Sequence, residues 1–162
     1  MTTESKQSSL NPVLQSALAV VAAILLGSIV NMALVMIGPA LVPPPPGVDM
    51  ADMDSFAAAV DEMGPLHFLF PFLAHALGTL TACLLVAKFS PRKKSVLAYA
   101  MGAFFLLGGI TAASMIPAPT WFVAADLLLA YLPMAWLALQ LVDTSERGSE
   151  ATTSDTQLNE EN

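Results

Sequence analysis

Four separate apolar segments dominate the sequence, and each is close to the length that crosses a lipid bilayer. They cover residues 12–37, 66–88, 95–116 and 121–142. A membrane-spanning helix needs about 20 predominantly apolar residues. Because the chain is 56% hydrophobic and only 12% charged, its polar side chains cannot cover its apolar surface in water. The sequence therefore predicts an all-α integral membrane protein, a four-helix bundle made of two antiparallel hairpins.

The polar sequence outside these segments is too short for a second folded domain. Residues 1–11 and 143–162 are predicted to be disordered tails. Seven of the thirteen acidic residues lie in these tails, so the net charge of −7 is best explained by their solvation. The six basic residues form no extended patch, which argues against nucleic acid as a partner.

The connection between the first two helices, residues 38–65, contains most of the remaining acidic residues. Gly38 and Pro39 are expected to end the first helix, because proline cannot continue the helical hydrogen-bond ladder. Residues 43–46 are four consecutive prolines, which predict a short, stiff polyproline II segment. Residues 52–63 repeat apolar side chains at three- to four-residue spacing. This pattern predicts a short amphipathic helix on the membrane surface.

Small residues recur at positions suited to close packing of the helices. In the second helix, Ala74, Gly78 and Ala82 repeat every four residues, and Gly102 lies in the third helix. Such stripes let helix backbones approach closely in a membrane. Pro71 is expected in the first turn of the regular second helix, or at a kink there.

The basic residues predict the topology. All six fall in the two tails or in the turn between the second and third helices: Lys6, Lys88, Arg92, Lys93, Lys94 and Arg147. The connections 38–65 and 117–120 contain no Lys or Arg. By the positive-inside rule, both termini and the middle turn are predicted to be cytoplasmic, and the other two connections to face outward.

Polar groups inside membrane-spanning helices are costly in hydrocarbon, which makes them candidates for function. Counted from the outer surface, Asn31, His75 and Asp126 all lie in the outer half of the predicted bilayer. If their helix faces converge, they would form a polar cluster in which His75 and Asp126 could relay a proton. His67 and Glu62 are accessory candidates near the outer surface.

Each of these residues also has a purely structural explanation. Asp126 lies near the start of its helix, where the helix dipole and interfacial water favour a carboxylate. His75 can pack as a neutral imidazole that bonds a neighbour, His67 can be an ordinary surface residue, and the Asn31 amide can bond across helices. The sequence leaves open whether the three faces converge.

No metal site, cofactor or catalytic constellation is predicted. His67 and His75 are eight residues apart, about 12 Å along one helix, whereas zinc needs its ligands at about 2.0–2.1 Å. Ligation of haem by two histidines at matched depth would require a homodimer. Cys83 is the only cysteine, which excludes an intramolecular disulfide. No nucleophile is paired with a base in the sequence, which argues against an enzyme without deciding the question.

Three stretches of the sequence carry a resemblance. VNMALVMIGPALVPPPPGVDMADMDS, HFLFPFLAHALGTL and MIPAPTWFVAADLLLAYLPMAWL resemble an uncharacterised family of small bacterial four-helix inner-membrane proteins, over about residues 25–137. The resemblance implies a bacterial inner membrane and brings no activity and no site residue. The chain does not resemble the small multidrug transporters, because its first helix contains no acidic residue.

Two classes of function follow. The first is a small membrane binding or assembly module, which would meet the lipid bilayer and form a homo-oligomer or part of a larger membrane complex. The second is a dimeric carrier of a small solute, ion or proton that uses Asn31, His75 and Asp126. Substitution of Asp126 by Asn separates them, because a scaffold should tolerate the change and a proton-coupled carrier should not.

Overall fold

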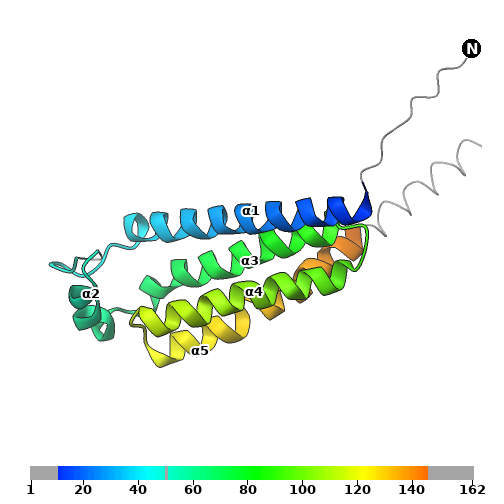
Figure 1. Cartoon of the computed structure of the whole chain (residues 1–162). Coiled ribbons are helices and arrows are strands. Elements are labelled where there is room, and N and C mark those ends of the chain that lie inside the picture. The colour runs from blue at the N-terminus through cyan, green and yellow to red at the C-terminus, as the bar shows by residue number, and fades with distance from the viewer. Residues whose placement is uncertain (1–10, 50, 146–162) are drawn as a thin grey trace, which may run out of the picture.

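The predicted all-α fold is confirmed by a computed structural model that describes residues 11–49 and 51–145, and these contain no strand. Four helical spans are long and apolar enough to cross a membrane: Pro12–Leu41, Pro65–Phe89, Lys94–Met115 and Thr120–Ser145. They lie side by side in alternating directions, with the start of the first and the end of the fourth at the same end of the bundle (Figure 1). The chain is thus a multi-pass membrane protein; nearly all of both tails lies outside the described residues.

The first span is one helix, α1 (Pro12–Leu41), capped at its start by the Asn11 side chain. The expectation that Gly38 and Pro39 end this helix is wrong, because α1 continues through them for two more residues. Pro39 removes a single hydrogen bond from the last turn. The N–H of Val42 then donates to the carbonyl oxygen of Gly38 at 2.8 Å, which closes the helix after the proline.

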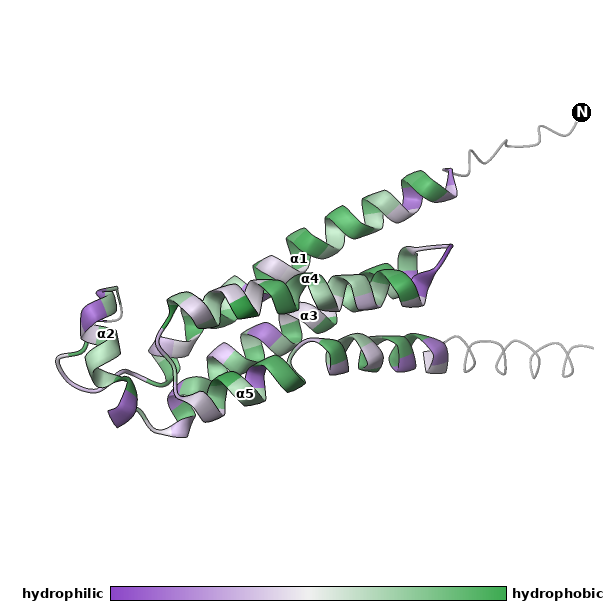
Figure 2. Cartoon of the chain, turned by 60° about the horizontal axis from the view of Figure 1, so that its bottom comes forward, coloured by the Kyte–Doolittle hydropathy of each residue, from purple (hydrophilic) through white to green (hydrophobic). Residues whose placement is uncertain are grey.

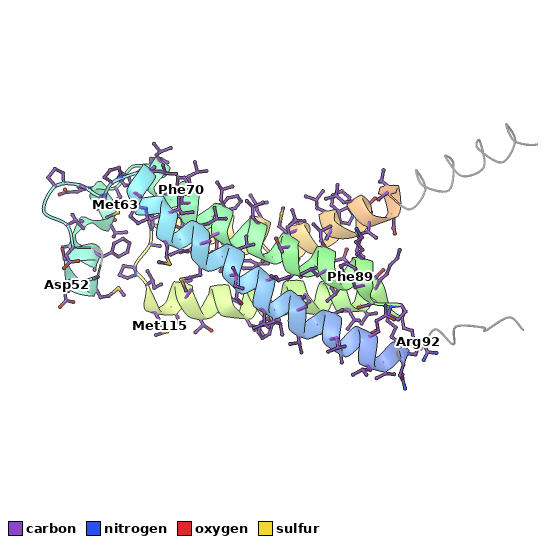
Figure 3. The ribbon with its side chains drawn as sticks, turned by 90° about the horizontal axis from the view of Figure 1, so that it is seen from above. Asp52, Met63, Phe70, Phe89, Arg92 and Met115 are labelled. Carbon is purple, nitrogen blue, oxygen red and sulfur yellow. The ribbon has the colours of Figure 1, made fainter. Side chains whose placement is uncertain are left out.

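Helix α1 packs along α3 (Leu69–Phe89) through small residues. At Gly27 an added Cβ would lie 2.8 Å from the carbonyl oxygen of Gly78, and at Gly78 it would lie 2.9 Å from that of Gly27. The two backbones therefore touch at this crossing, where any side chain on either residue would separate them. Seen from above, α1 runs diagonally over its neighbours (Figure 3).

The interior of the bundle is filled mainly by small side chains. Seven alanines have no exposed surface: Ala23, Ala74, Ala82, Ala98, Ala130, Ala135 and Ala138. Many large apolar side chains, such as Leu25, Leu107 and Leu128, point outward instead. Hydrophilic residues gather at the two ends of the bundle (Figure 2). Helices in a lipid bilayer typically pack closely through small residues, and leucines that face the equally apolar lipid tails carry no free-energy penalty.

The fourth span is interrupted, whereas the sequence predicted one helix over 121–142. Helix α5 (Thr120–Leu129) ends at Ala130, and a second helix covers 132–145. Pro133 explains the break, because it has no N–H to donate to the carbonyl of Leu129 and its ring would clash with that carbonyl. The proline instead lies in the first turn of the second helix, a position that it suits.

The long connection folds over one end of the bundle. The predicted helix within 52–63 is present as α2 (Met53–Ala59) followed by the 3-10 helix η1 (Val60–Glu62). A second 3-10 helix, η2 (Pro65–Phe68), leads into α3, which places Pro71 in the first turn of α3 as predicted. We call α2, η1 and η2 the end cap.

Apolar side chains fix the end cap to the helix ends. Val60 and Met63 pack with Phe68 and Phe122, all at most 9% exposed. At the opposite end, α4 (Lys94–Met115) begins with an ion pair of 2.8 Å between the Lys94 Nζ and an oxygen of Asp143. One end of the bundle is thus roofed by an end cap that packs through apolar side chains and exposes acidic ones, and the other end carries the basic turn.

Candidate functional site

His75 and Asp126 form a direct pair inside the bundle. His75 lies on α3 and Asp126 on α5, and the imidazole Nδ1 lies 2.9 Å from both carboxylate oxygens. The Asp126 side chain is 6% exposed and that of His75 is 22% exposed. The structure therefore brings together two of the three residues of the predicted cluster, and Asp126 is buried rather than at the hydrated surface.

Tyr131 completes the polar group. Its hydroxyl donates a hydrogen bond of 2.9 Å to the Asp126 Oδ2, and the whole residue is 1% exposed. The ring fits against Gly109 of α4, where an added Cβ would overlap the ring and the hydroxyl. The Tyr131 and His75 rings lie 5.8 Å apart between centroids. Asp126 therefore has partners for both oxygens without any water.

Sequence reasoning missed Tyr131, although a signal was present. Tyr131 is an aromatic hydroxyl within an apolar helix, five residues after Asp126 and two before Pro133. A buried tyrosine hydroxyl usually finds a partner, and proline interrupts the spacing of a regular helix. On an uninterrupted helix, positions five apart do not share a face as positions three or four apart do, so only the break explains this contact.

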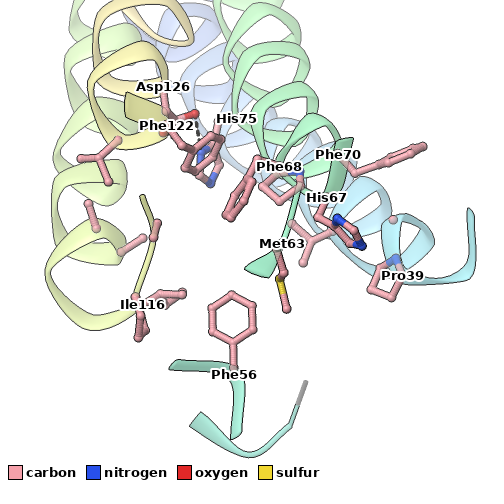
Figure 4. Close-up of a pocket in the computed structure, with 18 of the residues that line it drawn as sticks. Pro39, Phe56, Met63, His67, Phe68, Phe70, His75, Ile116, Phe122 and Asp126 are labelled. Atoms are coloured by element: carbon pink, nitrogen blue, oxygen red, sulfur yellow. Dashed lines mark hydrogen bonds and ion pairs between the residues drawn. The ribbon is translucent and has the colours of Figure 1, made fainter. Parts of the chain in front are cut away.

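A cavity of about 390 Å³ lies between the end cap and the helices. Its walls come from α1, α3, α4, α5 and the end cap and are almost entirely apolar. His75 and Asp126 lie at its inner end, and Phe56 and Met63 of the end cap lie toward its other end (Figure 4). The volume is at the lower end of the range of about 300–1,000 Å³ typical of small-molecule sites.

A second cavity, of about 560 Å³, opens along the side of the bundle between α1 and α4. Ser28 and Asn31 line it from α1 and Thr111 lines it from α4, and His75 and Tyr131 also contribute to its walls. His75, Gly109 and Ala112 line both cavities. His75 therefore lies where the two spaces meet.

The remaining predicted site residues lie apart from the pair. Asn31 is half-buried and lines the second cavity, but its side-chain amide makes no hydrogen bond within the described residues. The ring nitrogens of His67 lie 3.2 Å from the Gly64 carbonyl oxygen and 3.1 Å from that of Pro43. Glu62 is exposed on η1 and lines neither cavity.

The residues predicted to pack helices are all buried. Ala74, Gly78 and Ala82 lie within α3 against its neighbours. Gly102 faces the second half of the fourth span, where an added Cβ would lie 3.0 Å from that of Ala135. These positions fit the packing role that the sequence predicted for them.

The basic side chains that the structure describes lie away from the two cavities. Within the described part of the chain, neither cavity is lined by Lys or Arg. The basic residues Lys88, Arg92, Lys93 and Lys94 lie around the turn between α3 and α4, at the other end of the bundle (Figure 3). The arrangement can hold a proton and can hydrogen-bond a small molecule in an apolar space.

Comparison of the chain with protein-family models, curated proteins and solved structures finds no match. The likeness to a family of small bacterial inner-membrane proteins thus stays a prediction, and the function has to be argued from the geometry alone.

Proposed function

We propose that this protein is a small membrane binding module that takes a lipid-soluble molecule into the apolar cavity beneath its end cap. His75, held by Asp126, is the polar anchor of the site. We place the protein in a bacterial inner membrane with both termini in the cytoplasm. The charged turn between α3 and α4 then faces the cytoplasm and the end cap faces outward.

One observation carries this proposal: the His75–Asp126 pair ends an almost entirely apolar cavity, with Asp126 buried and hydrogen-bonded and one nitrogen of His75 left without a protein partner. Asp126 holds the Nδ1 side of the imidazole at 2.9 Å. The other nitrogen, Nε2, has no partner among the described residues and lies on the far side of the ring from Asp126 (Figure 4). A few placed polar groups in an apolar pocket are typical of small-molecule sites.

Tryptophan fluorescence can test for binding in this cavity. Trp136→Phe leaves Trp121 as the single tryptophan of the two in the chain. Trp121 stacks edge-on against Phe68, which lines the cavity, at 5.6 Å between centroids. Two brominated probes with medium-length alkyl chains, one an alkane and one a methyl ketone, are titrated into nanodiscs that contain the protein. At least one should quench Trp121 with a saturable component above the linear quenching due to the bilayer.

A matched pair of variants on α4 locates the bound probe. Ala113 lines the cavity, whereas Ala103 is exposed on the outer surface of the same helix. Ala113→Phe should remove the saturable quenching by filling the cavity, and Ala103→Phe should leave it unchanged. Saturation that survives equally in both variants, or no saturation by either probe in the parent protein, would overturn the proposal.

A second candidate function is a carrier of a small solute, ion or proton. The position of His75 between two cavities favours it, because a proton on the imidazole could be offered to either space. Asp126→Asn separates the candidates. The Asn amide can still accept from Tyr131 and donate to His75, so a binding module keeps its ligand. A proton carrier is expected to lose its pH-dependent flux in proteoliposomes, because an amide side chain does not take up and release a proton as a carboxylate does.

The proposed function also includes assembly with other membrane proteins or with further copies of this chain. Helix α1 has only four buried residues in its 30, Ala19, Ala23, Gly27 and Gly38. Its remaining surface is largely apolar and can meet either lipid or another chain. Homo-oligomerisation or membership of a larger membrane complex would cover this surface, and cross-linking in intact membranes measures it directly.

A further inference from the structure

The protonation of the His75–Asp126 pair follows from where the pair lies. Asp126 is 4% exposed, inside a membrane-spanning helix, with no Lys or Arg lining either adjoining cavity within the described residues. A net charge at such a position is strongly disfavoured in hydrocarbon. The pair is therefore most stable when its total charge is zero, which requires two protons shared between the carboxylate and the imidazole.

With the Tyr131 hydroxyl donating to Asp126 and every buried donor facing an acceptor, two arrangements of these protons are possible, and both leave one proton on Nε2. In an ion pair, the imidazolium carries a proton on Nδ1, facing Asp126, and another on Nε2. In a neutral pair, the carboxylic acid donates to Nδ1, and the imidazole is the tautomer that is protonated at Nε2. The hydrogen bond from Tyr131 to the Asp126 Oδ2 fits either arrangement. The nitrogen without a protein partner is thus a donor in each case.

We infer that the ligand of this cavity is an uncharged, lipid-soluble carbonyl compound whose oxygen accepts a hydrogen bond from the Nε2–H of His75. The inference rests on the proposed function and adds the chemical class of the ligand. A carbonyl oxygen needs only a donor, and His75 supplies one.

Other polar groups fit the cavity less well. A carboxylate or an ammonium would bring a net charge into an almost entirely apolar space that no described Lys, Arg or Glu lines. A hydroxyl would bring a donor of its own, and a buried donor without an acceptor is costly. The other histidine of the cavity, His67, has both nitrogens within 3.2 Å of backbone carbonyl oxygens, so it offers the ligand no free nitrogen.

The side opening suggests how such a molecule would arrive. The second cavity lies between α1 and α4 and is lined by His75, so a molecule dissolved in the bilayer can approach this side chain from the side of the bundle. Two sources share the required chemistry, a free lipid-soluble ketone and the ester carbonyl of a membrane lipid. Nanodiscs of ether-linked lipids lack the ester and so distinguish them.

Competition against a brominated probe measures the preference. Unlabelled chains of equal length, ending in a methyl ketone, a methyl group, a carboxylate or an ammonium, are titrated in ether-lipid nanodiscs. One net hydrogen bond corresponds to a factor of about ten in affinity. We expect the ketone to compete about tenfold better than the alkane, and the two charged chains to compete less well than the ketone.

Two variants isolate the donor. The reference is Asp126→Asn, in which the amide still holds Nδ1 and keeps the proton on Nε2. His75→Phe in this background removes the donor while keeping a ring, and should abolish the preference for ketone over alkane. His67→Phe is the matched control in the same cavity, and should keep the preference even if both affinities change.

Nitrogen-15 spectra of the histidines provide a measurement that does not depend on those variants folding. His67→Phe leaves one of the two histidines of the chain, so the remaining signals belong to His75. We expect a protonated Nε2 whose signal shifts on addition of the ketone and does not shift with the alkane. An unprotonated Nε2 in this spectrum would overturn the inference.

The outcomes separate this inference from the proposed function. If neither brominated probe quenches saturably, the proposed function itself fails. If alkane and ketone compete equally, or if a charged chain competes best, the cavity binds apolar molecules but the ligand class is wrong. A ketone preference that is strong in ether lipids and weak in ester lipids supports the inference and identifies a lipid ester as the competing occupant. An equal preference in both lipids supports it with a free carbonyl compound as the ligand.

Discussion

At the scale of single residues, Asp126 is the most demanding side chain in the bundle. A buried carboxylate inside a membrane helix is tolerated only when its oxygens have partners. The partners of Asp126 are His75, which comes from another helix, and Tyr131, which lies at the break in the span of Asp126 itself. The polar group is therefore a property of the folded bundle rather than of any one helix.

The hydrogen bond from Tyr131 can be tested by removing one oxygen. We expect Tyr131→Phe to lower the free energy of unfolding by about 1 kcal/mol, because hydrogen bonds between membrane helices contribute about 0.6 kcal/mol on average and up to about 1.7. Unfolding by a denaturing detergent in mixed micelles measures it. Tyr99→Phe is the control, since Tyr99 is exposed on α4 and its hydroxyl makes no hydrogen bond within the described residues. Equal effects of the two changes would contradict the role given to Tyr131.

At the scale of helices, the crossing of α1 and α3 depends on the absence of side chains. Gly27 and Gly78 bring their backbones into direct contact, and Asn31 packs beside them, with its Cβ 3.0 Å from where a Cβ on Gly78 would lie. This crossing holds α1 against α3 and so forms one wall of both cavities. The shape of the candidate site thus depends on residues that touch no ligand.

A pair of glycine substitutions tests this crossing. We expect Gly27→Ala to lower the free energy of unfolding by about 1–3 kcal/mol, because the new methyl group would meet the Gly78 carbonyl and the helices would have to separate. Gly108→Ala is the control, since nothing lies within 4 Å of its added Cβ. That change should be neutral or stabilising by up to about 1 kcal/mol through helix propensity. Detergent unfolding of both variants gives the comparison, and a harmless Gly27→Ala would show that the backbones do not touch.

At the scale of the whole molecule, the two ends of the bundle differ in chemistry. The end cap meets the helices through aromatic and aliphatic side chains, whereas the opposite end carries the basic turn and the Lys94–Asp143 ion pair. The long sides between them expose large apolar residues. A molecule of this shape and polarity can be oriented in a bilayer in only two ways, and the basic residues favour the one with the turn in the cytoplasm.

Cysteine labelling decides between these two orientations. Single cysteines at Ser55, Thr120 and Ser149, in a Cys83→Ser background, are labelled in intact cells with an impermeant maleimide. We expect labelling at positions 55 and 120 and none at 149, because the regions around 55 and 120 carry no Lys or Arg. Labelling at 149 alone would invert the protein and move the cavity to the cytoplasmic side.

The sequence by itself determined the four spans, although not the break within the fourth. Apolar segments of about 20 residues have to satisfy their backbone hydrogen bonds internally in lipid, so composition and length were sufficient to predict four spans. The three polar residues of the predicted cluster were found in the same way, because polar groups stand out in apolar helices. The exact ends were less predictable, since Pro39 proved compatible with the last turn of α1.

Only the tertiary structure decided which polar residues meet. One sequence gives the depth of a residue in the bilayer but not the rotation of its helix, so the pairing of His75 with Asp126 and the separation of Asn31 could not be derived. The break before Pro133 turned Tyr131 toward Asp126, which regular helical spacing does not predict. The cavities likewise arise where α1, α4 and the end cap fail to fill space together, and that depends on packing among segments far apart in the chain.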